Sequence, residues 1–419
     1  MSETSYNLSY MCLLPTELLL NIFYYLPAKD LWKIRGVCTR WLTIINEITE
    51  LDDLWRTFCI REFGTRFTII ARSKQKAGLN YFHLYRSLSL WNRLSDANED
   101  RDEFAAASRM NEEIRNFVIL DKNVLGVHKK GAVVYYDMET LKESKREPIT
   151  GDYSRYTEND VAIVIQSYHL ELYLIKKAIF DITSDDSNTT FSNGKLFYLT
   201  DDTLYFVTLS DEIYMCNYYK RQLKAHYITR SEDGIMSLGF MNKQLNILTF
   251  HRKIYTIVNN EMVFVCALGP DSNLLHQLKE YNFLEQLDWR IYFQWMYVLN
   301  HAIPDDGLLR DIIIIRPYGD VYFVGSNWGV LRIYYAPYAD GELDIFHTTP
   351  VKQYNFMERS DCPVLSTCQI LQIDVSEIED GHLVIVAMPK KIATLKFTHT
   401  FNSGPELALV PYRIPQIKL

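Results

Sequence analysis

LLPTELLLNIFYYLPAKDLWKIRGVCTRW, residues 13–41, holds three short apolar-patterned segments. In the first segment the aliphatic side chains recur every four residues, at Leu14, Leu18, Ile22 and Leu26. This spacing predicts a helix with a wide apolar face. Pro15 suits the first helical turn, where a missing N–H costs nothing, and Pro27 cannot continue the helix.

Two further apolar sets follow the second proline. The first contains Leu31, Trp32 and Ile34, and the second contains Val37, Trp41, Ile44, Ile45 and Ile48. Gly36 separates them, which predicts three short helices in a compact cluster. A unit of this size cannot enclose so much apolar surface alone, so we interpret it as a docking module.

The order and spacing of these residues resemble the F-box. The resemblance is carried by Leu14-Pro15, Glu17-Leu18, Ile22-Phe23, Leu26-Pro27, Asp30-Leu31, Val37-Cys38 and Arg40-Trp41. Further segments resemble the helices that commonly follow an F-box in substrate receptors, namely Leu54-Trp55-Arg56, Phe63-Gly64, Tyr85-Arg86 and Trp91. The resemblance covers roughly residues 11 to 94, about a fifth of the chain.

This resemblance implies that the N-terminal region binds the Skp-type adaptor of a cullin-RING ubiquitin ligase, and through it the cullin and RING subunits. The residues that it assigns to the adaptor-binding surface are Leu14, Pro15, Leu18, Ile22, Phe23, Leu26, Pro27, Leu31, Ile34, Val37, Cys38 and Trp41. The alternative is an ordinary three-helix core packed against the rest of the chain. Core packing demands apolar volume and not this particular order, which favours the F-box interpretation.

Composition sets limits on the rest. The 419 residues are 48% hydrophobic and 23% charged, as in globular proteins, and the net charge is −8. We therefore expect no attraction to nucleic acid or to an anionic membrane. Pro15, Glu17 and Asn21 interrupt the apolar N-terminal run, so we expect neither a membrane span nor a secretory leader. The seven cysteines form no C-x-x-C pair, which indicates reduced thiols in the cytoplasm or nucleus.

The chain is expected to combine an α-helical part with an all-β part. We predict an F-box at 11–50, a helical connector at 51–115 and a β domain at 116–419. The apolar residues Leu79, Phe82, Tyr85, Leu88 and Trp91 predict a largely buried helix over 79–94. The acidic residues 95–113 are expected to form a solvated linker or an exposed helix.

From about Phe117 the apolar period changes to two, and turn pairs separate short runs rich in Val, Ile, Tyr and Phe. About two dozen such runs predict repeated four-stranded meanders, which indicate a β-propeller of six or seven blades, with seven favoured. The repeats contain neither a Trp-Asp nor a Gly-Gly pair. A pair of β-sandwiches or an irregular barrel remains the alternative. The segment 407–413 is expected to close the ring.

Signals for chemistry are weak. The ten histidines occur singly, without a two-ligand helical spacing, and no phosphate-binding glycine motif is present. Cys362 and Cys368 have no second pair, and His382 is interpreted as a hydrogen-bonding residue at a turn. We therefore predict no catalytic residue, no metal and no cofactor.

The tyrosines offer weak candidates for a substrate-binding surface, because rigid amphipathic rings at strand ends can anchor a partner peptide. These candidates are Tyr218, Tyr219, Tyr334, Tyr335 and Tyr338. The leading hypothesis is a non-catalytic substrate-recognition subunit of an SCF-type ubiquitin ligase, with a protein substrate held by the β domain. The alternatives are a ligase-independent F-box scaffold and, least favoured, a propeller hydrolase.

Overall fold

The computed structural model describes residues 14–399 apart from 64–79, 108, 110, 121–122, 178–187, 221, 270–273, 285, 288–290, 293, 296–311, 338–342, 344, 346–347 and 358–367. The chain divides into two compact units. The first unit comprises Met1–Asp100, Ser376–Leu383 and Lys396–Leu419, and the second comprises Arg101–Val375 and Val384–Leu395. The predicted domain boundaries at residues 50 and 115 stay predictions.

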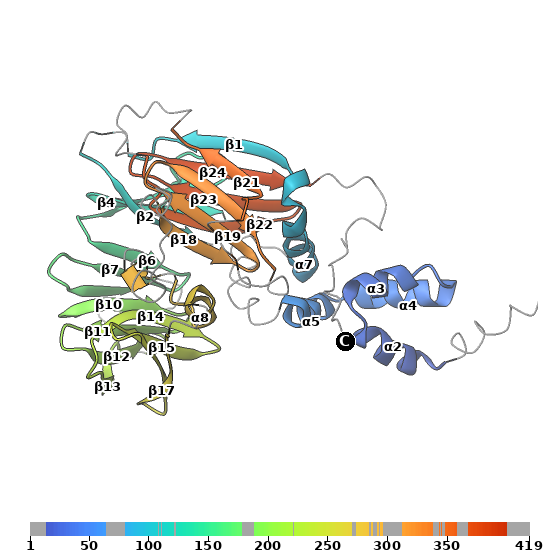
Figure 1. The fold of residues 1–419 in the computed structure, drawn as a ribbon, viewed down its shortest axis with the longest axis horizontal. Coiled ribbons are helices and arrows are strands. Elements are labelled where there is room, and N and C mark those ends of the chain that lie inside the picture. Colours follow the sequence, from blue (N-terminus) through green and yellow to red (C-terminus); the bar gives the residue numbers. More distant parts are fainter. Residues whose placement is uncertain are drawn as a thin grey trace, which may run out of the picture. The chain divides into compact units, whose positions relative to one another are not determined.

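The three helices expected in the N-terminal stretch are present (Figure 1). They are α2 (Thr16–Tyr25), α3 (Ala28–Ile34) and α4 (Thr39–Thr49). Pro15 immediately precedes α2 and Pro27 immediately precedes α3, with φ angles of −52° and −58°. Proline fixes φ near the helical value and lacks an N–H, so it is tolerated where a helix begins and excluded from its interior. Each proline therefore sets a helix start, as predicted.

One face of each of these helices contributes to a small core. The fully buried side chains include Leu19, Phe23, Leu31 and Ile45. The rings of Phe23 and Trp41 meet edge to face, with centroids 5.3 Å apart. Each such apolar side chain contributes about 1.5–3 kcal/mol when it is removed from water. The three helices thus depend on one another for stability.

Two further helices and a 3₁₀ segment follow in the same unit: α5 (Asp52–Phe63), α7 (Tyr81–Ser89) and η2 (Trp91–Asp96). The predicted helix over 79–94 is therefore divided, with the α-helical part ending at Ser89. Tyr85 and Leu88 are buried in α7, and Trp91 is buried in the 3₁₀ segment. Leu79 lies outside the described residues.

The described residues contain 24 strands in six antiparallel sheets of four strands each (Figure 1). Five of the sheets use consecutive strands. The second sheet is β2 (Ile114–Leu120), β3 (Val124–Lys129), β4 (Ala132–Asp137) and β5 (Ile149–Thr150). The third is β6 (Arg155–Glu158), β7 (Ala162–Gln166), β8 (Leu172–Lys176) and β9 (Asn188–Phe191).

The next three sheets repeat this pattern. The fourth is β10 (Gly194–Leu199), β11 (Thr203–Thr208), β12 (Glu212–Asn217) and β13 (His226–Arg230). The fifth is β14 (Ile235–Met241), β15 (Gln244–Thr249), β16 (Lys253–Val258) and β17 (Glu261–Ala267). The sixth is β18 (Ile312–Tyr318), β19 (Val321–Ser326), β20 (Val330–Tyr335) and β21 (Lys352–Asn355).

The first sheet is the exception, because its strands come from distant parts of the sequence. Its order is β1 (Asn98–Phe104), β24 (Ile392–Thr398), β23 (Gly381–Ala387) and β22 (Gln372–Ile378). The prediction of a linker or exposed helix over 95–113 is therefore wrong at β1. The strand is rich in charged side chains, as edge strands often are, and charge of this kind hides the period of two.

Several predicted hairpins are confirmed, whereas the turn predicted at Asp340-Gly341 lies outside the described residues. Asn259 and Asn260 join β16 to β17, and both have positive φ angles, 51° and 65°. Two consecutive residues with positive φ form the type I′ turn that suits the twist of antiparallel strands, and asparagine tolerates this conformation. The pairs Asp201-Asp202 and Ser210-Asp211 likewise separate β10, β11 and β12.

Successive sheets pack face to face through apolar clusters. Val133 and Ile165 belong to one cluster that joins the second and third sheets, and Leu172 and Phe206 belong to another that joins the third and fourth. The fourth and fifth sheets share a cluster that includes Ile213 and Leu245. The third and fourth sheets therefore each bury both faces against their neighbours.

The first sheet closes the series. Phe117 on β2 donates its N–H to Gln372 Oε1 (2.8 Å), and Gln372 Nε2 donates to Phe117 O (2.9 Å). On the other side, Arg316 on β18 donates to Asp374 Oδ1 on β22 (3.3 Å). A closed series of six four-stranded sheets is a β-propeller, which confirms the predicted fold class.

The described residues thus hold six sheets, within the predicted range and one below the favoured number. A sandwich needs only two sheets, so six separate sheets exclude that alternative for this region. The segment 407–413, which was expected to close the ring, lies outside the described residues. In the described part of the chain β1 takes the closing position, beside β24.

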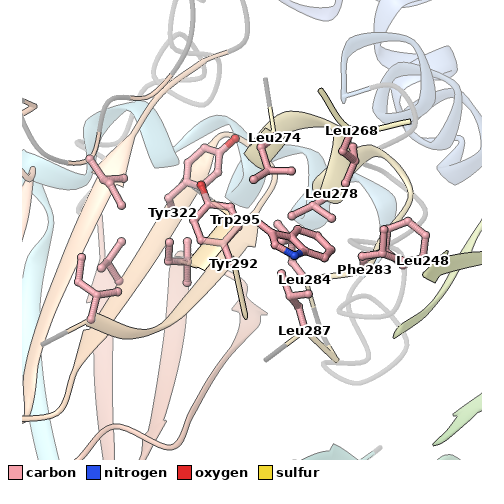
Figure 2. Packing of buried hydrophobic residues seen from close by; sticks show 14 of the residues in the cluster. Leu248, Leu268, Leu274, Leu278, Phe283, Leu284, Leu287, Tyr292, Trp295 and Tyr322 are labelled. Atoms are coloured by element: carbon pink, nitrogen blue, oxygen red, sulfur yellow. The ribbon is translucent and has the colours of Figure 1, made fainter. Parts of the chain in front are cut away.

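A helical insertion separates the fifth and sixth sheets. It contains α8 (Leu274–Glu280). Figure 2 shows Leu274 and Leu278 of α8 near Trp295 in a buried cluster. The cluster also includes Leu248 of the fifth sheet and Tyr322 of the sixth. The insertion therefore fills the space between these two sheets with apolar side chains.

Candidate functional site

The first candidate surface lies on α2, where aliphatic side chains remain exposed. Leu18 is 49% exposed and Ile22, one helical turn later, is 37% exposed. Val37, between α3 and α4, is 43% exposed, and Pro15 is also exposed. We call Pro15, Leu18, Ile22 and Val37 the exposed apolar row. Large aliphatic groups in water at this spacing form a ready surface for another protein.

The other predicted adaptor-binding residues are less exposed. Phe23, Leu31 and Trp41 are buried in the helical core, and their assignment to the adaptor-binding surface stays a prediction. Leu14, Leu26, Ile34 and Cys38 are half-buried, and Pro27 is exposed. The period of four explains this division, because Leu19 and Phe23 occupy the helix face next to Leu18 and Ile22.

Two residues of α5 hold the turn between α2 and α3. Glu62 Oε1 accepts the N–H of Ala28, the first residue of α3 (3.1 Å). Arg61 donates through Nη1 to Tyr24 O (3.0 Å) and through Nη2 to Leu26 O (2.5 Å), at the end of α2. A carboxylate at a helix start and a guanidinium at a helix end satisfy the free backbone groups and oppose the helix dipole. We call Arg61 and Glu62 the α5 clamp.

The α5 clamp has no distinctive sequence signal. A charged pair at the end of an amphipathic helix is common, and its partners lie more than thirty residues away along the chain. Glu62 also accepts the hydroxyl of Tyr85 on α7 (2.5 Å). Burial of the ring, followed by the charge of Glu62, raises the pKa of Tyr85, so this tyrosine stays a hydrogen-bond donor.

The candidate substrate-binding tyrosines do not form one surface. Tyr218 is only 1% exposed and Tyr334 only 3%, so the prediction of an anchoring role is wrong for both. Tyr218 accepts a hydrogen bond from Asn159 Nδ2 (2.7 Å), and the Tyr334 hydroxyl donates to Ile345 O (3.3 Å). Tyr219 is 54% exposed and Tyr335 is half-buried. Tyr338 lies outside the described residues.

A buried polar cluster in the first unit contains a serine, a histidine and a glutamate. Glu377 accepts hydrogen bonds from Trp91 Nε1 (3.0 Å) and from the Ser87 hydroxyl, and its Oε2 lies 2.6 Å from His382 Nδ1. Burial opposes the charge of Glu377. The charge of His382 and the hydrogen bonds from His382, Ser87 and Trp91 outweigh burial and hold the pKa of this carboxyl below its usual value.

This cluster does not have the geometry of a hydrolytic triad. In such a triad the carboxylate and the hydroxyl engage opposite ring nitrogens of the histidine. Here Ser87 Oγ lies 3.4 Å from Nδ1, the same nitrogen that faces Glu377, and the His382 ring stacks on Trp91 with centroids 3.6 Å apart. All three polar side chains are fully buried. The cluster instead fixes the turn after β22 to α7 and η2, which agrees with the expected hydrogen-bonding role of His382.

Across the described residues, no group of three or more His, Cys, Asp or Glu side chains is placed to hold a metal ion. Within the same part of the chain, no helix is both long and apolar enough to cross a membrane.

Comparison with known proteins gives one match to a family. The family model described as F-box-like matches residues 11–61. No curated protein sequence matches the chain. The matched residues contain α2, α3, α4 and most of α5, and so include the exposed apolar row and Arg61 of the α5 clamp.

Solved structures give weaker likenesses. The chain resembles Hsv2 of Kluyveromyces lactis with 9% identity and a TM-score of 0.32, over 65% of this chain and 78% of that one. It resembles the N-terminal domain of Nup159 with 10% identity and a TM-score of 0.34, over 68% of this chain and 76% of that one. Scores this low carry no argument about function, and the propeller fold rests on the six sheets themselves.

The family match and the helical geometry agree with each other. The matched stretch folds into short helices that begin at Pro15 and Pro27, and it leaves Leu18 and Ile22 exposed. Residues 11–61 of this chain are therefore an F-box-like domain, followed in the sequence by a β-propeller.

Proposed function

We propose that this chain is the substrate-recognition subunit of an SCF-type ubiquitin ligase. The observation that carries the proposal is the exposed apolar row within the F-box-like domain. F-box domains generally bind Skp-type adaptors, and the row offers aliphatic side chains for such a contact. The propeller would hold a target protein, and the cytoplasm or nucleus would be the site of action.

The size of the exposed apolar row fits a docking contact. Burying a large aliphatic side chain fully contributes about 1.5–3 kcal/mol, and side chains already half covered contribute about half as much. Leu18, Ile22 and Val37 together would therefore contribute about 3 kcal/mol, with the surrounding contacts adding to this. The chain itself needs no bond chemistry, because holding a target near a charged conjugating enzyme raises its effective concentration.

The experiment compares the full-length chain with a double variant, Leu18→Ala with Ile22→Ala, which trims the exposed side chains and leaves Leu19 and Phe23 in the core. We expect about tenfold less Skp-type adaptor to copurify, because 1.4 kcal/mol of lost contact corresponds to a tenfold weaker complex. Ile60→Ala is the matched control, since Ile60 is 49% exposed on α5 and outside the exposed apolar row. Equal recovery of the adaptor by both variants would reject the docking surface.

A second experiment, in cells that express the wild-type chain or the double variant, tests the role of the propeller. When cullin activation is inhibited, proteins bound to a receptor should accumulate on the wild-type chain because their turnover stops. They should not change on the Leu18→Ala, Ile22→Ala chain, which no longer reaches the ligase. If the amount of bound protein on the wild-type chain does not change with the inhibitor, the chain is instead a scaffold whose partners are not degraded.

A further inference from the structure

A pocket opens between the third and fourth sheets of the propeller, away from the F-box-like domain in the sequence. Its volume is about 570 Å³, and it is lined by residues of β9, β11 and β12, of the segments that follow β9 and β11, and by Ala225 before β13. Most of its lining side chains are hydroxyl-bearing or aromatic, and Glu212 is the only carboxylate among them. The pocket thus combines aromatic rings with a single carboxylate.

The aromatic side of the pocket is a ladder across the fourth sheet. Phe206 on β11 lies directly opposite Tyr214 on β12, and Tyr214 lies opposite Tyr227 on β13. The rings of Phe206 and Tyr214 stack with centroids 5.3 Å apart and an angle of 11°. Phe191 on β9 stacks on Phe206 from the third sheet, with centroids 4.9 Å apart. The ladder runs from a buried Phe206 to an exposed Tyr227.

Glu212 lies beside this ladder, and its carboxylate can pair with a cation of a partner. Its Oε2 accepts the Tyr214 hydroxyl (3.2 Å), which holds the carboxylate next to the ring. Two cations of the same sheet have other partners. Lys195 pairs with Asp211, and Arg230, opposite Glu212 on β13, donates through Nε to Ser210 O (3.1 Å). Among the described residues, no cation forms an ion pair with Glu212.

A stacked aromatic face next to an unpaired carboxylate matches the chemistry of a guanidinium group. Arginine can lay its planar group over an aromatic ring and donate two parallel hydrogen bonds to a carboxylate. A lysine ammonium can also lie over a ring, but it is a point charge that neither stacks flat nor forms the two parallel hydrogen bonds. The surrounding hydroxyls of Thr208 and Ser210 offer further acceptors for the remaining guanidinium N–H groups.

We propose that this pocket binds an arginine side chain in an extended segment of the target protein. Leu209, 57% exposed at the edge of the pocket, would cover the aliphatic stem of that arginine. The inference rests on the proposed function, since it names the chemistry by which the propeller recognises its substrate.

The test screens the purified full-length chain against a displayed library of random nonapeptides. Arginine should be enriched at least threefold among the selected peptides. For the tightest selected peptide, replacing its arginine by citrulline should weaken binding at least tenfold, and replacing it by lysine at least threefold. The Glu212→Gln chain should lose the enrichment.

The matched control is Glu171→Gln. Glu171 accepts the hydroxyl of Tyr173 (2.6 Å), in the same two-residue arrangement as Glu212 and Tyr214, but outside the pocket. Both variants remove one negative charge, so a general attraction of arginine to an acidic protein would be reduced equally in both. Tyr214→Leu removes the ring without changing the charge, and it should also abolish the preference for arginine over lysine.

The results separate the two proposals. Adaptor copurification is measured on the same preparations, and Glu212→Gln should leave it unchanged. If the selected peptides show no enrichment of arginine, or if the enrichment persists with the Glu212→Gln chain, the pocket assignment is wrong. Neither result affects the proposed binding of the adaptor. If the wild-type chain selects arginine-containing peptides but no adaptor copurifies with it, the pocket assignment holds and the proposed ligase function is wrong.

Discussion

His128 lies fully buried in β3, with its Nδ1 2.7 Å from Asn116 Oδ1. Asn116 in turn donates through Nδ2 to Tyr156 O on β6 (2.7 Å), so the pair connects the second sheet to the third. Burial, and then the charge of Arg115, lowers the pKa of His128 from 6.5 to about 4. The ring is therefore neutral in the folded protein at pH 7, and its protonation favours the unfolded chain.

We predict that His128 contributes to the sensitivity of the protein to mild acid. The unfolded chain takes up a proton below pH 6.5, which the folded protein does not take up until about pH 4. The contribution of His128 to the free energy of unfolding is thus present above pH 6.5 and is lost as the pH falls toward 4. Between pH 7 and pH 5 the free energy of unfolding should fall by about 2 kcal/mol through this group.

Urea unfolding at the two pH values measures this loss. His128→Gln should show a smaller decrease than the wild type, because glutamine keeps a polar group but does not titrate. His169→Gln is the control, since His169 is exposed. A decrease of the same size in wild type and His128→Gln would contradict the assignment.

The α5 clamp shows how one helix can position two others. Arg61 satisfies the end of α2 and Glu62 satisfies the start of α3, so the turn at Pro27 is held from both sides. Glu62 is held in turn by the Tyr85 hydroxyl of α7. The orientation of the exposed apolar row therefore depends on a helix that contributes none of its side chains to that row.

We predict that Glu62→Ala loosens the start of α3, because it removes both the helix cap and the partner of a buried tyrosine hydroxyl. The local stability should fall by about 1–3 kcal/mol. Hydrogen exchange of the Leu31 amide should accelerate by at least tenfold, and recovery of the adaptor should fall with it. Glu47→Ala, which changes an exposed glutamate of α4, should do neither. Unchanged exchange at Leu31 would show that the clamp is dispensable.

Among helices and strands, the apolar periodicity predicts those features that depend on residues close together in the sequence. The apolar spacing and the two prolines located α2, α3 and α4, and paired turn residues located hairpins such as β16 to β17. β1 was missed because its charged side chains give no alternation. The burial of Tyr218 was missed because the sequence around a tyrosine at a strand end does not show whether its ring points toward solvent or toward the next sheet. The α5 clamp was missed because its contacts cross from one helix to two others.

At the scale of the whole propeller, the meeting of β1 with the last strands closes the ring. Glu103 on β1 accepts Lys391 Nζ (2.6 Å) and pairs with Arg101 (2.5 Å). Arg101 also lies over the ring of Phe356, 4.6 Å from its centroid, just after β21 of the sixth sheet. A chain of contacts through these charged residues thus connects the first sheet to the sixth.

We predict that Glu103→Lys weakens this closure, because it places a third cation beside Arg101 and Lys391 where these side chains are largely buried. The free energy of unfolding of the propeller should fall by about 1–3 kcal/mol, as measured in urea. Asp100→Lys makes the same change of charge at an exposed position of the same strand and should have little effect. Equal unfolding of the two variants would exclude a closing role for Glu103.

The composition of the first sheet also bears on how the protein is made. β1 leaves the ribosome early, whereas its hydrogen-bonded neighbour β24 ends at Thr398, almost three hundred residues later. Throughout that interval of translation the nascent chain carries an unmatched strand edge, while the F-box-like helices can already fold from contacts close in sequence. A polypeptide released early would hence carry a folded F-box-like domain followed by an open ring, whose unpaired strand edge is free to associate with other chains.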